Sequence, residues 1–151
     1  MEEQNRKNSD STQQRLAKQA VFDKIEQWLN VSLEHKPKIL VGKTYMQPDF
    51  YSKEDGIIGF IVVHIGKLKA GQKEKLSQHI LRMLLVEKLE GRAYRKMIVV
   101  GDQPVKEQIE GDSILAECIS QFQIEVKIMP MEAELRERLL TAQKKQVMVN
   151  A

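Results

Sequence analysis

The sequence predicts a three-layer α/β domain in which helices flank a mixed central sheet. Segments whose apolar residues recur at helical spacing alternate with short segments that are apolar on every residue or on every second residue. The prolines and most glycines fall between these segments, where breaks in the backbone ladders are expected. The chain has 151 residues, 42% hydrophobic and 30% charged, which fits one globular core and excludes collagen-like, disordered and disulfide-scaffold classes.

The amino-terminal part predicts a tail followed by a long helix. Residues 1–10 are polar without an apolar anchor, so we expect a mobile tail there and a single domain over 11–151. Ser11 and Gln14 form a capping-box pattern, and apolar residues then recur at helical spacing. We therefore expect a helix from about residue 12 to 32.

Three strands in an antiparallel meander should follow the helix. Residues 38–46 and 49–52 have extended patterns, and the pair Asp55–Gly56 favours a two-residue hairpin turn. Residues 57–65 are apolar on both phases, as in a strand covered on both faces. We expect this strand at the centre of the sheet.

The second half alternates helices and strands. A long apolar stripe predicts a helix over 72–90. Because a helix precedes it, the strand at 97–100 should pair in parallel with the central strand or with a neighbour of that strand. Two short helical segments follow Asp102 and Ser113. Residues 124–128 alternate in polarity and predict a strand near an edge, and 131–147 predict a charged final helix.

Positive charge is concentrated locally. The net charge is only +3, from 24 Lys and Arg against 21 Asp and Glu. One basic cluster lies at the start of the 72–90 helix and a second lies beyond its end; their members are Lys67, Lys69, Lys73 and Lys75, then Arg92, Arg95 and Lys96. These residues are the candidates for contacts with nucleic-acid phosphates, and a solvated surface is the alternative.

Several known sites are excluded by missing motifs. The sequence contains no G-x-x-x-x-G-K, G-x-G-x-x-G, C-x-x-C or H-E-x-x-H pattern, which disfavours nucleotide hydrolysis and zinc binding. Its longest apolar run is too short for a membrane helix, so no membrane partner is expected. The lone cysteine and the absence of a secretory signal predict a cytoplasmic location.

The candidate site is built around Asp49. With a two-residue turn at Asp55–Gly56, Asp49 should stand opposite Val62, on the face that also carries Phe60 and His64. A second metal ligand would have to stand on this face. Bracing of the turn after Pro48 is the structural alternative for Asp49, and a hydrogen-bonded core role is the alternative for His64.

The chain resembles the PD-(D/E)xK nuclease superfamily, the restriction-endonuclease-like fold. The resemblance lies in Pro48-Asp49, in the order of elements, and in the strand 57–65 that leads through Gly-Lys-Leu-Lys into a long helix. It implies that Asp49 and a second carboxylate hold a divalent metal such as Mg²⁺, while a lysine two residues further on helps to activate water. This chain has Val62 and His64 at those two positions.

Three functions remain open from the sequence. The first is a restriction-endonuclease-like domain with a degenerate site, retaining Asp49 and His64 as vestiges, that binds DNA or RNA or serves as a structural subunit of a nucleic-acid-processing assembly. The second is an active nuclease that uses Mg²⁺, Asp49 and a carboxylate recruited from Glu87 or another chain. The third is a protein-interaction or homodimerisation domain, because apolar residues on the 72–90 and 131–147 helices exceed one stripe.

Overall fold

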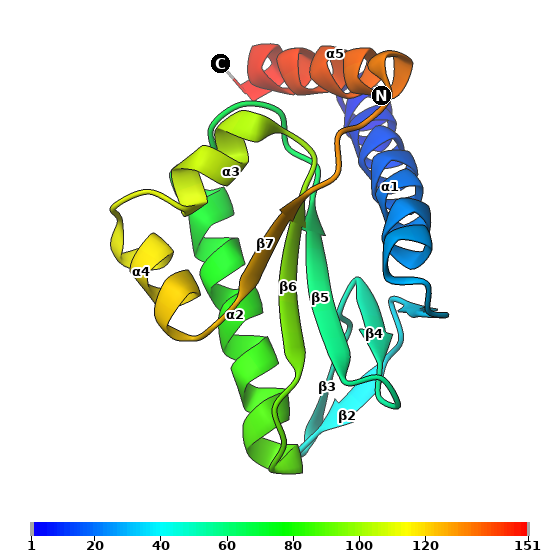
Figure 1. The fold of residues 1–151 in the computed structure, drawn as a ribbon. Helices are drawn as coiled ribbons and strands as arrows, with labels where there is room; N and C mark the ends of the chain where they lie inside the picture. Colours follow the sequence, from blue (N-terminus) through cyan, green and yellow to red (C-terminus); the bar gives the residue numbers. More distant parts are fainter. Residues whose placement is uncertain (1, 151) are drawn as a thin grey trace.

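A five-stranded mixed sheet forms the middle layer of the domain, as the computed structural model shows (Figure 1). The structure describes residues 2–150, with side chains for residues 11–147. The strands β1, β4 and β5 are antiparallel neighbours, and β5, β6 and β7 are parallel neighbours. In the order of the sheet, their bounds are β1 (Glu34–His35), β4 (Phe50–Ser52), β5 (Ile57–Val62), β6 (Arg95–Val100) and β7 (Glu125–Ile128).

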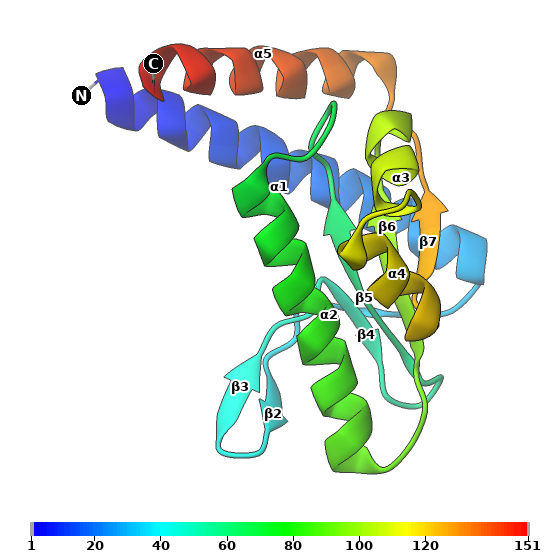
Figure 2. The same cartoon turned by 90° about the vertical axis from the view of Figure 1, so that its left-hand side faces the viewer.

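Helices cover both faces of this sheet. On one side α1 (Glu2–Leu29) packs on the strands and α5 (Ala133–Asn150) runs alongside α1, as Figure 2 shows. On the other side lie α2 (Ala70–Glu90), α3 (Gln103–Ile109) and α4 (Ile114–Gln121). The predicted three-layer α/β class is confirmed. None of the helices within 2–150 combines the length and apolarity needed to cross a bilayer.

The strand β5 joins the two hydrophobic cores. Its residues Ile58 and Phe60 pack toward α2, whereas Ile57 and Ile61 pack toward α1, and all four are at most 5% exposed. Successive side chains of a strand point to opposite faces, so a strand buried on both sides must be apolar at every position. The predicted central position of this strand is thus confirmed, although it ends at Val62 and not at residue 65, and so is the predicted edge strand near 124–128.

The predicted meander is wrong in one respect. Residues 38–46 form a separate two-stranded sheet of β2 (Ile39–Val41) and β3 (Thr44–Met46) instead of a strand of the central sheet. Gly42, with a φ of 61°, allows the chain to reverse between them. The central sheet is extended by β1 instead.

The register between β4 and β5 also differs from the prediction. Ser52 pairs with Ile57, so the turn has four residues, 53–56, instead of two. The hydroxyl of Ser52 accepts from the Asp55 backbone N–H at 3.1 Å and donates to the Asp55 carboxylate at 2.8 Å. Gly56, the last residue of this turn, adopts a φ of 65°. Continued by one residue beyond β4, this register places Asp49 beside Phe60 and not Val62, although a shift of two residues leaves the face unchanged.

The amino-terminal helix has longer bounds than expected. It begins at Glu2 instead of near residue 12, and neither proline nor glycine interrupts residues 2–11. The predicted tail, residues 1–10, falls where the structure describes no side chains. Its mobility stays a prediction.

Replacement of Gly59 by alanine should destabilise the fold by about 2 to 3 kcal/mol, because the added methyl would overlap the fully buried ring of Phe50. The free energy of unfolding in urea measures this. Gly71→Ala is the matched control, since nothing lies within 4 Å of its added methyl. In that helix position we expect no loss and a gain of up to about 1 kcal/mol. Equal losses in both variants would contradict this packing account.

Candidate functional site

A hollow of about 460 Å³ lies between α1, α2 and the β2–β3 hairpin, three elements that are labelled in Figure 2. We call it the basic groove. Its charged lining consists of five Lys or Arg side chains and one carboxylate: Lys18, Lys36, Lys38, Lys75, Arg82 and Asp49. Such an excess of fixed positive charge favours anionic ligands.

The cations of the groove come from α1, from the segment between β1 and β2, and from α2. On α2, Lys75, His79 and Arg82 are spaced four and three residues apart, which places them on one face of the helix. Lys36 and Lys38 flank Pro37 in the segment between β1 and β2. Tyr45 of β3 lines the same groove, with the Lys38 ammonium 4.8 Å from its ring centre.

Asp49 is held at the base of the groove by its main chain and its side chain. Its backbone N–H donates to the Gly59 carbonyl at 3.0 Å, and its carbonyl accepts from Lys36 at 3.2 Å. Its carboxylate Oδ2 accepts from the Ile61 backbone N–H at 2.7 Å. Asp49 is 6% exposed, so this bond replaces a strand partner that β4 no longer supplies to β5.

Lys18 of α1 is the cation nearest to this carboxylate. Its Nζ lies 3.7 Å from Asp49 Oδ2, and the two side chains are 24% and 8% exposed. Burial lowers the pKa of Lys18, Asp49 opposes that effect, and Lys36 and Lys75 lower the pKa further. One carboxylate thus faces several positively charged side chains in this groove.

His79 contributes a neutral imidazole. Its ring stacks on Phe60, with centroids 3.9 Å apart and an interplanar angle of 7°. Arg82 Nη1 lies 3.1 Å from Nδ1, and because a guanidinium only donates, Nδ1 is the acceptor and Nε2 carries the proton. Burial first, then Arg82, Lys75 and Lys18, lowers the pKa of His79 from 6.5 to about 3.

His64 lies in an adjoining hollow of about 160 Å³, which Lys18, Lys75 and His79 also line. The Gln72 amide lies 3.0 Å from His64 Nδ1. Asp49 lines the basic groove and His64 lines the second hollow, and their joint catalytic role stays a prediction.

The loop beyond β5 is held by three side chains from other elements. Gln143 of α5 makes two hydrogen bonds to the backbone of Ile65, at 2.9 and 3.1 Å. Asp102 accepts from the Gly66 N–H at 2.7 Å. Gln108 of α3 makes two hydrogen bonds to Leu68, at 2.6 and 3.1 Å. This loop is thereby fixed next to the second hollow.

The first predicted basic cluster is placed only in part at the groove. Lys75 lines the groove. Lys67 and Lys69 are exposed on the loop beyond β5, and Lys73 is exposed on the first turns of α2. A phosphate contact by these three lysines stays a prediction.

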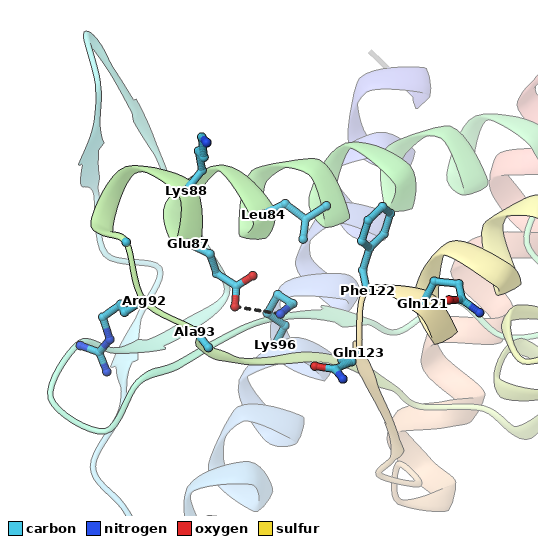
Figure 3. A pocket seen from close by; sticks show the side chains of 10 residues that line it. Leu84, Glu87, Lys88, Arg92, Ala93, Lys96, Gln121, Phe122 and Gln123 are labelled. Carbon is cyan, nitrogen blue, oxygen red and sulfur yellow. Dashed lines mark hydrogen bonds and ion pairs between the residues drawn. The ribbon is translucent and has the colours of Figure 1, made fainter.

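Each side chain of the second predicted basic cluster has a polar partner within the chain. Lys96 is 6% exposed and its ammonium contacts Glu87 at 2.8 Å, the dashed line in Figure 3. Arg95 makes two hydrogen bonds of 3.0 Å to Glu125. Arg92 donates to the Lys53 carbonyl at 2.9 Å. Lys96 is therefore not placed to contact a phosphate, because its side chain is buried and its ammonium is paired with Glu87.

A divalent metal implied by the resemblance does not fit the residues at Asp49. Mg²⁺ prefers several oxygen ligands in octahedral geometry, but Phe60 stands opposite Asp49 and Lys18 contacts its carboxylate. Glu87, the acid considered for recruitment, binds Lys96 and the Tyr94 N–H at the other end of α2. Within the described part of the chain, no group of three or more His, Cys, Asp and Glu is placed to hold a metal ion.

Sequence reasoning missed most of the basic groove. Its unrecognised members are Lys18, Lys36, Lys38, His79 and Arg82. The i, i+4, i+7 spacing from Lys75 to Arg82 was a readable signal. No local pattern signals Lys18, because only the packing of α1 against the sheet brings it to Asp49.

Comparison with known proteins finds no matching family model, no matching curated protein and no matching solved structure. Membership of the PD-(D/E)xK superfamily stays a prediction from the sequence.

The neutral state of His79 predicts a pH-dependent stability. Its pKa is lower in the folded chain, about 3, than the ordinary 6.5, so the unfolded chain binds more protons between those values. The part of the unfolding free energy that depends on neutral His79 is fully present above pH 6.5 and is lost as the pH falls toward 3. We expect His79→Gln to flatten the pH dependence of the unfolding free energy in that window. Above pH 7 the two curves should run parallel, and equal slopes below pH 6.5 would refute the assignment.

Proposed function

We propose that this chain is a restriction-endonuclease-like domain with a degenerate metal site, and that it binds the phosphate backbone of nucleic acid in the basic groove. The observation that carries the proposal is the lining of that groove, five fixed cations around a single carboxylate that is already bound. Phosphate contacts of this kind supply affinity without sequence specificity.

The chemistry of the groove supports binding over cleavage. Hydrolysis of a phosphodiester by metal-activated water requires a bound metal, and Asp49 has no acidic neighbour in the groove lining. His79 is neutral at physiological pH with the proton on Nε2, so it can donate one hydrogen bond without adding charge. Exposed Tyr45 offers a single aromatic surface, too little for a row of stacked bases.

Charge reversal tests the groove directly. Lys38→Glu combined with Lys75→Glu changes two lysines of the groove that come from different elements. We expect weaker binding to duplex DNA by at least about tenfold, and a slope of log affinity against log salt that falls by about two. Lys53→Glu with Lys88→Glu is the matched control, because it makes the same charge change at exposed lysines outside the groove. Fluorescence anisotropy across a salt series measures both, with duplex RNA as a parallel probe.

Two outcomes would overturn the proposal. Equal losses in the groove and control variants would mean that binding is delocalised over the surface. Cleavage of plasmid DNA or RNA in Mg²⁺ or Mn²⁺ that disappears in Asp49→Ala would instead establish the active-nuclease alternative.

An exposed apolar row on α2 favours a second candidate function, association with a partner protein or a second copy. Leu81, Leu85 and Leu89 recur every fourth residue and are 69%, 41% and 53% exposed. By contrast, Leu139 and Ala142 of α5 are buried, so the surplus expected on that helix is used inside the domain.

Association of two copies through this row predicts a mass that rises with concentration in sedimentation equilibrium. Leu81→Lys with Leu85→Lys should then abolish the rise, since buried charge opposes association. Leu40→Lys is a control at another exposed leucine, 66% accessible, in β2. A monomeric mass at all concentrations would exclude self-association.

A further inference from the structure

The resemblance implies a divalent metal at Asp49, and in this chain the Lys18 ammonium lies beside that carboxylate. The Lys18 ammonium lies 3.7 Å from the Asp49 carboxylate and both side chains line the basic groove. The same carboxylate oxygen accepts from Ile61 at 2.7 Å, so Asp49 keeps a fixed orientation. A cation from the chain itself therefore neutralises the one acid that would otherwise repel a phosphate.

We propose that Lys18 acts as a built-in substitute for a divalent cation, and that the groove therefore binds a phosphodiester without metal. This inference rests on the proposed nucleic-acid binding. Mg²⁺ ordinarily joins one or two carboxylates to substrate phosphates, and an ammonium between carboxylate and phosphate makes the same charge bridge. It has no water to activate, so binding is retained while hydrolysis is not.

The position of Lys18 fits this role better than that of the other groove lysines. Lys36, Lys38 and Lys75 are exposed, whereas the Lys18 side chain is 24% accessible and reaches the carboxylate from α1. Packing of α1 on the sheet holds this residue, since Ala17 and Val21 beside it are at most 1% exposed. A fixed ammonium loses less freedom on meeting a phosphate than a mobile one does.

Removal of Lys18 should make binding depend on metal. In Lys18→Met, the Asp49 carboxylate faces the groove without its cation, and we expect duplex DNA affinity in EDTA to fall at least about tenfold. Mg²⁺ or Mn²⁺ at fixed ionic strength should restore at least about fivefold, because without the Lys18 ammonium beside the Asp49 carboxylate a hydrated metal ion can join that carboxylate to a phosphate. Wild-type affinity should be the same in EDTA and in Mg²⁺.

Three further variants isolate the effect. Lys18→Met with Asp49→Asn removes both charges and should show no metal response, while its amide oxygen can still accept from Ile61. Lys38→Met should lose affinity without gaining a metal response, since Lys38 belongs to the groove wall and not to the ion pair. Lys18→Arg should keep metal-independent binding. Circular dichroism verifies that each variant is folded before its binding is measured.

The outcomes separate this inference from the proposed function. Wild-type binding that requires Mg²⁺, or a Lys18→Met variant whose affinity does not respond to metal, overturns the substitution while nucleic-acid binding stands. A wild-type chain that binds neither DNA nor RNA, with or without metal, overturns the proposed function itself.

Discussion

The backbone N–H of Ile61 lies in the central strand just beyond the end of β4, and the carboxylate of Asp49 pairs it. An unpaired N–H at such a buried position would cost about 1 to 3 kcal/mol. The same carboxylate forms an ion pair with Lys18, and this pair links α1 to the sheet at the groove. Asp49 thus completes the strand, and its charge is balanced by Lys18. Its structural role and its place in the groove cannot be separated, because both use one carboxylate oxygen.

The fold could be predicted largely because hydrophobic burial decides it. Residues 57–63 contain no polar side chain, and His64 is the first one in the segment 57–65. A segment without polar side chains on either face predicts a central strand. The register could not be predicted from the Asp55–Gly56 pair. Two hydrogen bonds between Ser52 and Asp55 favour a four-residue turn, and Gly56 takes the left-handed conformation at its last position. Because the error was two residues, the face of Asp49 was right and its neighbour was wrong.

The candidate site was less predictable because charge clusters in sequence are not clusters in space. Arg95 and Lys96 follow Arg92 closely in the chain, yet Arg95 is bound by Glu125 and Lys96 by Glu87. The groove instead collects lysines from α1, from the segment around Pro37 and from α2, which are far apart in sequence. Only the spacing along α2 is a local pattern. The remaining members depend on how α1 and the β2–β3 hairpin pack against the sheet.

The positive charge of the groove disfavours protonation of two of its groups. Burial and neighbouring cations lower the pKa of both Lys18 and His79. A bound phosphate would reverse the electrostatic part of those shifts, since an opposite charge favours the protonated form of either group. By linkage, protonation and anion binding must then strengthen each other. Asp49 provides part of that counter-charge when no ligand is bound, and it does so for Lys18 alone. The open positive charge around His79, Lys75 and Arg82 is what an anion would meet.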